Sequence, residues 1–123
     1  MALEIDYESH LPLALASIYD DEDSKSKASV ELERYGKKSF HREIPRVRLG
    51  ILYLASKSPE RLSSFVDLAC SDYRDLLCAS EYPHSSRRFG LSDTDPEKYR
   101  SLKDKETKEY MAWIAELQKT KEP

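Results

Sequence analysis

Glycine is scarce in this chain: its three residues, Gly36, Gly50 and Gly90, each stand alone. Loops that cradle phosphate groups need clustered glycines, because backbone amides must approach the ligand closely. Neither a GxGxxG nor a GxxxxGK[ST] pattern occurs, so the common nucleotide-binding motifs are excluded. Few glycines and few runs of β-branched residues together favour a helical protein.

Long hydrophobic runs are also missing. The richest run covers residues 49–55, whereas a membrane-spanning helix needs about 20 apolar residues. The first residues are acidic, where a secretory leader would be basic. We therefore expect a soluble, cytoplasmic protein without a membrane partner. In that compartment Cys70 and Cys78 are predicted to be reduced thiols that are buried as small apolar side chains.

The chain has few of the patterns that metal binding or catalysis requires. Its histidines lie in separate segments: His10, His41 and His84. The acidic run at residues 20–23 fails the calcium-loop pattern, since Lys25 and Ser26 stand where a ligand oxygen and a glycine are needed. We predict no metal and no cofactor. No pairing of nucleophile and base stands out, so no catalytic residue is predicted and an enzyme is the least favoured class.

What the chain does contain is charge that is sorted along its length. Residues 1–23 carry seven acidic residues and no Lys or Arg, while residues 34–48 carry six basic residues and one acid. Opposite charges attract over about 8 Å at physiological salt. Two interpretations follow: the acidic segment covers the basic one, or each meets a partner of opposite charge. We take the internal contact as the default.

Hydrophobic periodicity predicts helices over residues 10–20, 25–40, 44–57, 59–71, 73–81 and 96–119. Two of these have alternatives: Gly36 can end the second helix early, and the last can be broken near residues 102–104. Pro45 and Pro59 suit the first turns of their helices. Helix 44–57 is apolar on most sides, as expected for a helix that several neighbours cover.

The predicted fold is all-α, with residues 1–123 forming a single domain. It is a compact bundle of five or six helices around a central hairpin of residues 44–57 and 59–71. Outside the helices we predict an acidic arm at residues 1–9, a long loop at 83–94 and a frayed tail at 120–123. Tyr110, Trp113 and Leu117 share a helix face and are predicted to be core residues. The alternative is that this helix is only half covered, in which case Trp113 would anchor a partner or a second copy of the chain.

The basic segment is the candidate binding site, because Tyr35 and Phe40 are interleaved with its cations. A mid-helix glycine costs about 1 kcal/mol relative to alanine, so Gly50 indicates close approach of another helix or a ligand. The predicted basic and aromatic patch consists of Arg42, Arg46, Gly50, Tyr53, Arg87 and Arg88.

These observations favour a small soluble helical interaction or regulatory module, which binds another protein or associates with itself through its charged surface. The alternative is a nucleic-acid-binding protein that uses residues 34–48. The sequence pI of about 5.7 argues against this alternative, because nucleic-acid-binding domains are usually basic. A second alternative is an enzyme whose site is not visible in the sequence.

Overall fold

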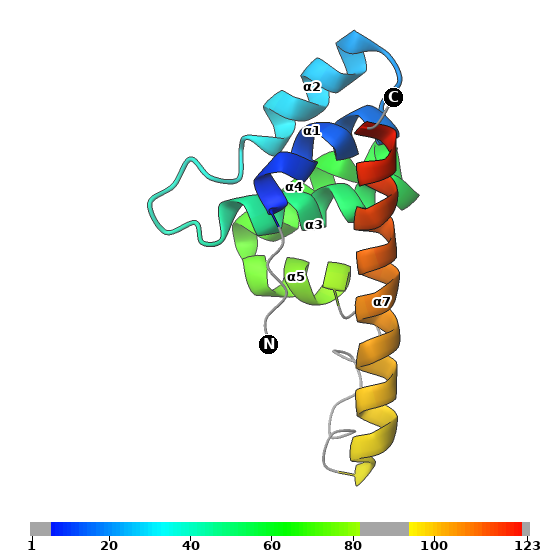
Figure 1. The fold of residues 1–123 in the computed structure, drawn as a ribbon. Helices are drawn as coiled ribbons and strands as arrows, with labels where there is room; N and C mark the ends of the chain where they lie inside the picture. Colours follow the sequence, from blue (N-terminus) through cyan, green and yellow to red (C-terminus); the bar gives the residue numbers. More distant parts are fainter. Residues whose placement is uncertain (1–5, 82–93, 122–123) are drawn as a thin grey trace.

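Six α-helices make up the part of the chain that the computed structural model describes, residues 6–81 and 94–121, and no strand occurs there. The predicted all-α bundle is confirmed (Figure 1). The helices are α1 (Tyr7–Ile18), α2 (Glu22–Leu32), α3 (Ile44–Lys57), α4 (Leu62–Ser71), α5 (Tyr73–Glu81) and α7 (Pro96–Lys121), with the 3-10 turn η1 (Pro59–Arg61) before α4.

Helix α3 is the centre of the bundle, as its apolar sequence predicts. It packs against α1, α4 and α5, and its side chains Val47, Leu49, Ile51, Leu52 and Ala55 are fully buried. Pro45 lies in its first turn, and the tight connection through η1 turns the chain back into α4. The α3–α4 hairpin therefore forms the core on which the outer helices pack.

Helix α7 is longer than its neighbours and continuous, so the possible break near 102–104 is absent and the first two residues of the predicted tail are helical. Tyr110, Ile114 and Leu117 are buried, as predicted for a core stripe, and Trp113 is half-buried. The first half of α7 extends beyond the other described helices (Figure 1). No described helix is both long and apolar enough to span a membrane.

Helix α1 begins earlier than its hydrophobic pattern predicts. The Asp6 carboxylate accepts a hydrogen bond from the Ser9 backbone N–H at 3.1 Å and so caps the helix. Residues 7–9, predicted to belong to an acidic arm, are instead its first turn, and residues 1–5 lie outside the described ranges.

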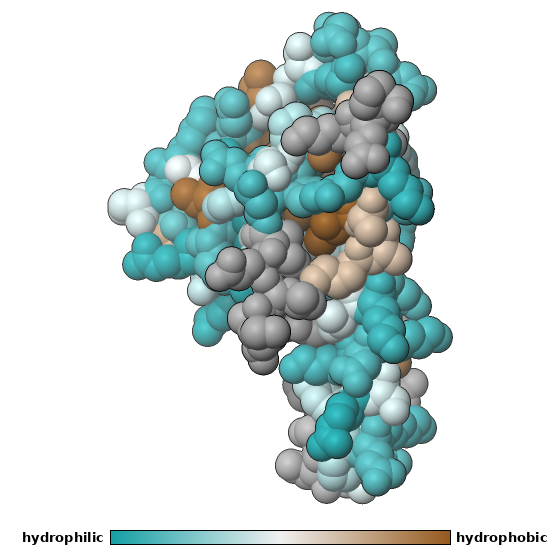
Figure 2. Space-filling model, in the orientation of Figure 1, coloured by the Kyte–Doolittle hydropathy of each residue, from teal (hydrophilic) through white to brown (hydrophobic). Residues whose placement is uncertain are grey.

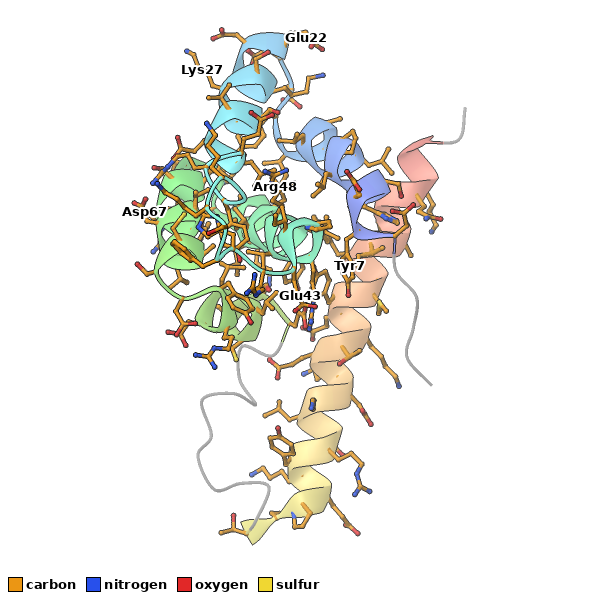
Figure 3. All side chains as sticks on the ribbon, turned by 90° about the vertical axis from the view of Figure 1, so that its left-hand side faces the viewer. Tyr7, Glu22, Lys27, Glu43, Arg48 and Asp67 are labelled. Carbon is orange, nitrogen blue, oxygen red and sulfur yellow. The ribbon has the colours of Figure 1, made fainter. Side chains whose placement is uncertain are left out.

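The acidic run at residues 20–23 starts a helix as well as following one. Helix α1 ends at Ile18, and the Asp21 carboxylate then caps α2 by accepting from the Ser24 N–H at 2.9 Å. That hydrogen bond lowers the pKa of Asp21. Negative charge at a helix N-terminus is favourable, which explains why α2 begins at Glu22 rather than at residue 25. Glu22 and Lys27 mark the outer part of α2 in Figure 3.

Helix α2 ends at Leu32, so the prediction of a helix to residue 40 is wrong. Residues 33–43 form a loop that projects from one end of the molecule (Figure 1). Gly36 has a φ of 123°, a backbone conformation that favours glycine and is incompatible with a continuing helix.

The two cysteines are free, but they are less buried than predicted. Cys70 is half-buried at the end of α4, and Cys78 is exposed on α5. Helix α5 directs Leu76, Leu77 and Ser80 into the core, so Cys78 lies on its opposite side. The prediction of a buried thiol is therefore wrong for Cys78.

Candidate interaction surface

Arg46 is held in an ion pair at the start of α3. Its Nε lies 2.8 Å from Glu81 Oε2, its Nη2 lies 2.6 Å from Glu81 Oε1, and its Nη1 lies 3.0 Å from Glu43 Oε2. The hydrogen bonds to Glu81 are the main cause of the raised pKa of Arg46. The bidentate contact between Arg46 and Glu81 therefore connects the start of α3 to the end of α5.

Two further arginines of the basic segment are also committed to contacts within the protein. Arg34 pairs with Glu31 on α2 and with Asp67 on α4. Arg48 donates from Nε to the Tyr35 carbonyl oxygen at 2.9 Å. Asp67 and Arg48 are labelled in Figure 3, which looks toward the loop 33–43. These arginines therefore attach the loop and its flanking helices to the bundle.

The neutralising carboxylates are not those that the sorted charge suggests. Glu31, Glu43, Asp67 and Glu81 all lie outside residues 1–23. Within the acidic segment, Glu22 and Asp23 pair instead with lysines of their own helix, Lys25 and Lys27. Internal neutralisation of part of the basic segment is thus present, but the acidic partners come from α2, α4, α5 and the loop.

Three cations of the basic segment remain exposed without an ion pair to any described residue: Lys37, Lys38 and Arg42. All three belong to the loop 33–43, and the Arg42 guanidinium donates a hydrogen bond from Nη1 to the Ser39 carbonyl oxygen at 3.3 Å. Phe40 lies among them with 64% of its surface exposed. We call these four residues the loop surface.

Exposure of Phe40 is unusual in this molecule. Val30, on α2, is the other large hydrophobic residue that is exposed in the described ranges. Hydrophilic residues predominate on the face in Figure 2, and hydrophobic ones appear in separate small areas. Aromatic side chains and arginines are enriched at binding surfaces relative to the rest of a protein surface.

The conformation of the loop is held from inside by His41. Its Nδ1 accepts hydrogen bonds from the backbone N–H of Gly36 at 2.7 Å and of Lys38 at 3.4 Å. The His41 ring is buried and stacks on Tyr35, with 4.3 Å between the ring centroids. Because both ends of the loop are held by one packed pair of rings, the loop surface is presented in a preformed shape.

A groove of about 280 Å³ lies between this loop and the junction of α4 with α5. We call it the α4–α5 groove. Its aromatic walls come from the loop and from Tyr73, and its rim includes the exposed Arg74. The residues that line it are Tyr35, Phe40, His41, Ala69, Cys70, Ser71, Asp72, Tyr73 and Arg74.

The residues of the sequence-predicted patch occupy different environments. Arg42 is exposed on the loop, whereas Arg46 is in the ion pair with Glu81. Gly50 is buried beneath α5: a Cβ there would lie 2.8 Å from Ser80 Oγ, so the predicted close approach is made by a helix. Tyr53 is buried and stacks on Tyr110 at 4.8 Å.

Arg87 and Arg88 lie outside the described residues, as does most of the predicted 83–94 loop. A binding role for the six predicted residues stays a prediction. Lys37, Lys38 and Phe40 belong to the basic segment but are not among the six predicted residues, and the predicted helix 25–40 includes them. Gly36 was the signal that could have found them, since a helix that stops there leaves a short basic and aromatic loop.

In the described ranges, no group of three or more His, Cys, Asp or Glu residues is placed to hold a metal ion. Comparison with family models, with curated proteins and with solved structures finds no match to this chain.

Proposed function

We propose that this protein is a small helical interaction module that binds an acidic segment of another protein through its loop surface. The observation that carries the proposal is the combination of exposed Phe40 with the unpaired cations Lys37, Lys38 and Arg42. The other arginines of the basic segment are used internally, so these cations are the ones left to meet a partner. Charge complementarity steers such an encounter and sets its specificity.

The test is the affinity for a fluorescently labelled peptide rich in Asp and Glu that contains one Phe, measured by anisotropy. The comparison peptide has the same length, with Asn and Gln in place of the acids. We expect the acidic peptide alone to bind, and its affinity to fall as salt is raised, because exposed charges are screened. Equal binding of the two peptides, or none by the acidic one, contradicts the proposal.

The charge-reversal variant Lys37→Glu/Lys38→Glu is expected to lower the affinity at least about tenfold, since it replaces attraction by repulsion at the loop surface. The matched control is Lys98→Glu/Lys105→Glu, which makes the same change in net charge at exposed positions of α7. An equal effect of both variants would indicate a nonspecific dependence on net charge.

The second candidate is binding of single-stranded nucleic acid by the same surface. An exposed aromatic ring flanked by cations can stack on a base while the cations contact phosphates. The sequence pI of about 5.7 disfavours it, because nucleic-acid-binding domains are usually basic. A labelled random oligonucleotide at about 50 mM salt, where phosphate contacts are strong, provides the test. Binding that is lost in Lys37→Glu/Lys38→Glu would favour this candidate over the acidic peptide.

A further inference from the structure

We propose that the α4–α5 groove receives an aromatic side chain of the partner protein, from the same acidic partner segment that the loop surface binds. This inference rests on the proposed function and adds the anchor residue that the partner must carry. The loop connects the two sites directly, because Phe40 belongs to the loop surface and also lines the groove. A partner segment that contacts Lys37 and Lys38 therefore lies close to the groove, because Phe40 is only two residues further along the loop.

The size and walls of the groove suit a ring. Its volume of about 280 Å³ is sufficient for one aromatic side chain, and its walls include Phe40 and Tyr73. Phe40 meets the His41 ring edge-on, with 5.0 Å between the ring centroids. Aromatic rings favour such edge-to-face and offset contacts, which contribute beyond the area that they bury. An inserted ring thus finds aromatic partners already in position.

The charges around the groove favour a partner that carries acidic residues on either side of the inserted aromatic side chain. Arg74 is exposed at the rim, and its guanidinium Nε lies 3.7 Å from Asp72 Oδ1. The same Asp72 oxygen accepts the Arg74 backbone N–H at 3.0 Å, so this carboxylate is engaged at the start of α5. Lys38 and Arg42, both exposed, lie in the loop within two residues of the lining residues Phe40 and His41, and Asp72 is the one carboxylate among the residues that line the groove.

The alternative occupant of an aromatic-lined site is a quaternary ammonium group, which binds to the faces of several rings. Here the face of His41 is used by Tyr35, which is itself fully buried in the core. The surrounding cations would also repel a positive ligand. Both features favour the anionic segment with an aromatic anchor.

The first experiment compares the acidic Phe peptide with the same peptide carrying Ala in place of Phe. If the ring is buried, the Ala peptide binds about tenfold or more weakly to the full-length protein, as for anchor residues of interfaces. The variant Ser71→Trp, at an exposed position that lines the groove, should remove this preference. The matched control Ser64→Trp adds the same bulk at an exposed position of α4 outside the groove and should keep it.

The second experiment uses the cysteines as reporters of where the peptide lies. Cys70 lines the groove, whereas the exposed Cys78 does not, so it serves as the internal reference. Saturating peptide should slow alkylation of Cys70 by iodoacetamide severalfold and leave the rate at Cys78 unchanged. Protection that rises with protein concentration and needs no peptide would identify a second copy as the occupant and overturn the inference.

These outcomes separate the two proposals. Equal binding of the Phe and Ala peptides, with Lys37→Glu/Lys38→Glu still weakening both, overturns the groove and leaves the proposed function standing. Absence of binding to any acidic peptide overturns both. Protection of Cys70 by the oligonucleotide and not by the peptide would assign the groove to a nucleic-acid base.

Discussion

The Tyr35 hydroxyl makes two hydrogen bonds to the backbone of Arg42: it donates to the carbonyl oxygen at 2.7 Å and accepts from the N–H at 3.0 Å. These bonds join the two ends of the loop 33–43, close to the end of α2 and the start of α3. Each hydrogen bond contributes about 0.5–1.5 kcal/mol, so Tyr35→Phe should lower the free energy of unfolding by about 1–3 kcal/mol.

The loop should also open locally in Tyr35→Phe. Amide hydrogen exchange at Arg42 is expected to accelerate more than at Leu52 in the centre of α3, since local opening exposes only the loop. Equal acceleration at both amides would mean that the substitution acts on global stability alone. His41→Ala should produce the same pattern at the Gly36 amide, which loses its acceptor.

Gly50 should not tolerate alanine. The new Cβ would lie 2.8 Å from Ser80 Oγ and 3.0 Å from Leu76 Cδ1, so these two side chains, both buried in the core, have to shift. Overpacking costs about 1–3 kcal/mol and exceeds the gain of about 1 kcal/mol from replacing a helical glycine. Urea unfolding should therefore show a less stable Gly50→Ala protein.

A double-mutant cycle checks the cause of the Gly50→Ala effect. Ser80→Ala removes the nearest atom, so the cost of Gly50→Ala should be smaller in that background than in the parent. If the two substitutions are additive, Ser80 is not the obstacle.

The ion pair between Arg46 and Glu81 should contribute more to the free energy of unfolding than the exposed ion pairs do. The side chains are 31% and 10% exposed, and the contact is bidentate. Glu81→Gln leaves the partly buried Arg46 guanidinium without the negative charge of its main partner. We therefore expect the free energy of unfolding to fall by about 1–3 kcal/mol. The control is Glu116→Gln, which breaks the exposed pair with Lys119 and should change stability by less than about 0.5 kcal/mol. Similar losses for both would contradict this ranking.

Tyr110 carries a buried hydroxyl that makes no hydrogen bond to a described residue. Burial, with the nearby Glu81 charge, also raises its pKa. Tyr110→Phe removes the unsatisfied group and keeps the ring stacked on Tyr53, so stability should be unchanged or rise by about 1 kcal/mol. Thermal unfolding measures this, with Tyr110→Ala as the control that loses the packing, at about 3–5 kcal/mol. A marked loss in Tyr110→Phe would show that the hydroxyl has a partner, such as a bound water.

The helices with strong apolar periodicity were predictable from the sequence. Helices α3 and α5 have the predicted bounds, because their apolar faces repeat at helical spacing and Pro45 and Asp72 mark where they begin. The start of α2 was not predictable in this way, since four consecutive acids suit neither the end of one helix nor an apolar face. The capping geometry of Asp21 settles it in the folded chain.

The sequence by itself determined the helical class, the central hairpin and the existence of a surplus of cations in residues 34–48, because these depend on local spacing and composition. Only the tertiary structure decided which of those cations stay exposed. Pairing requires a carboxylate at a few ångströms, and the partners of Arg34 and Arg46 come from Asp67 and Glu81, far along the chain. The same long-range packing left Phe40 at the surface, beside Lys37 and Lys38.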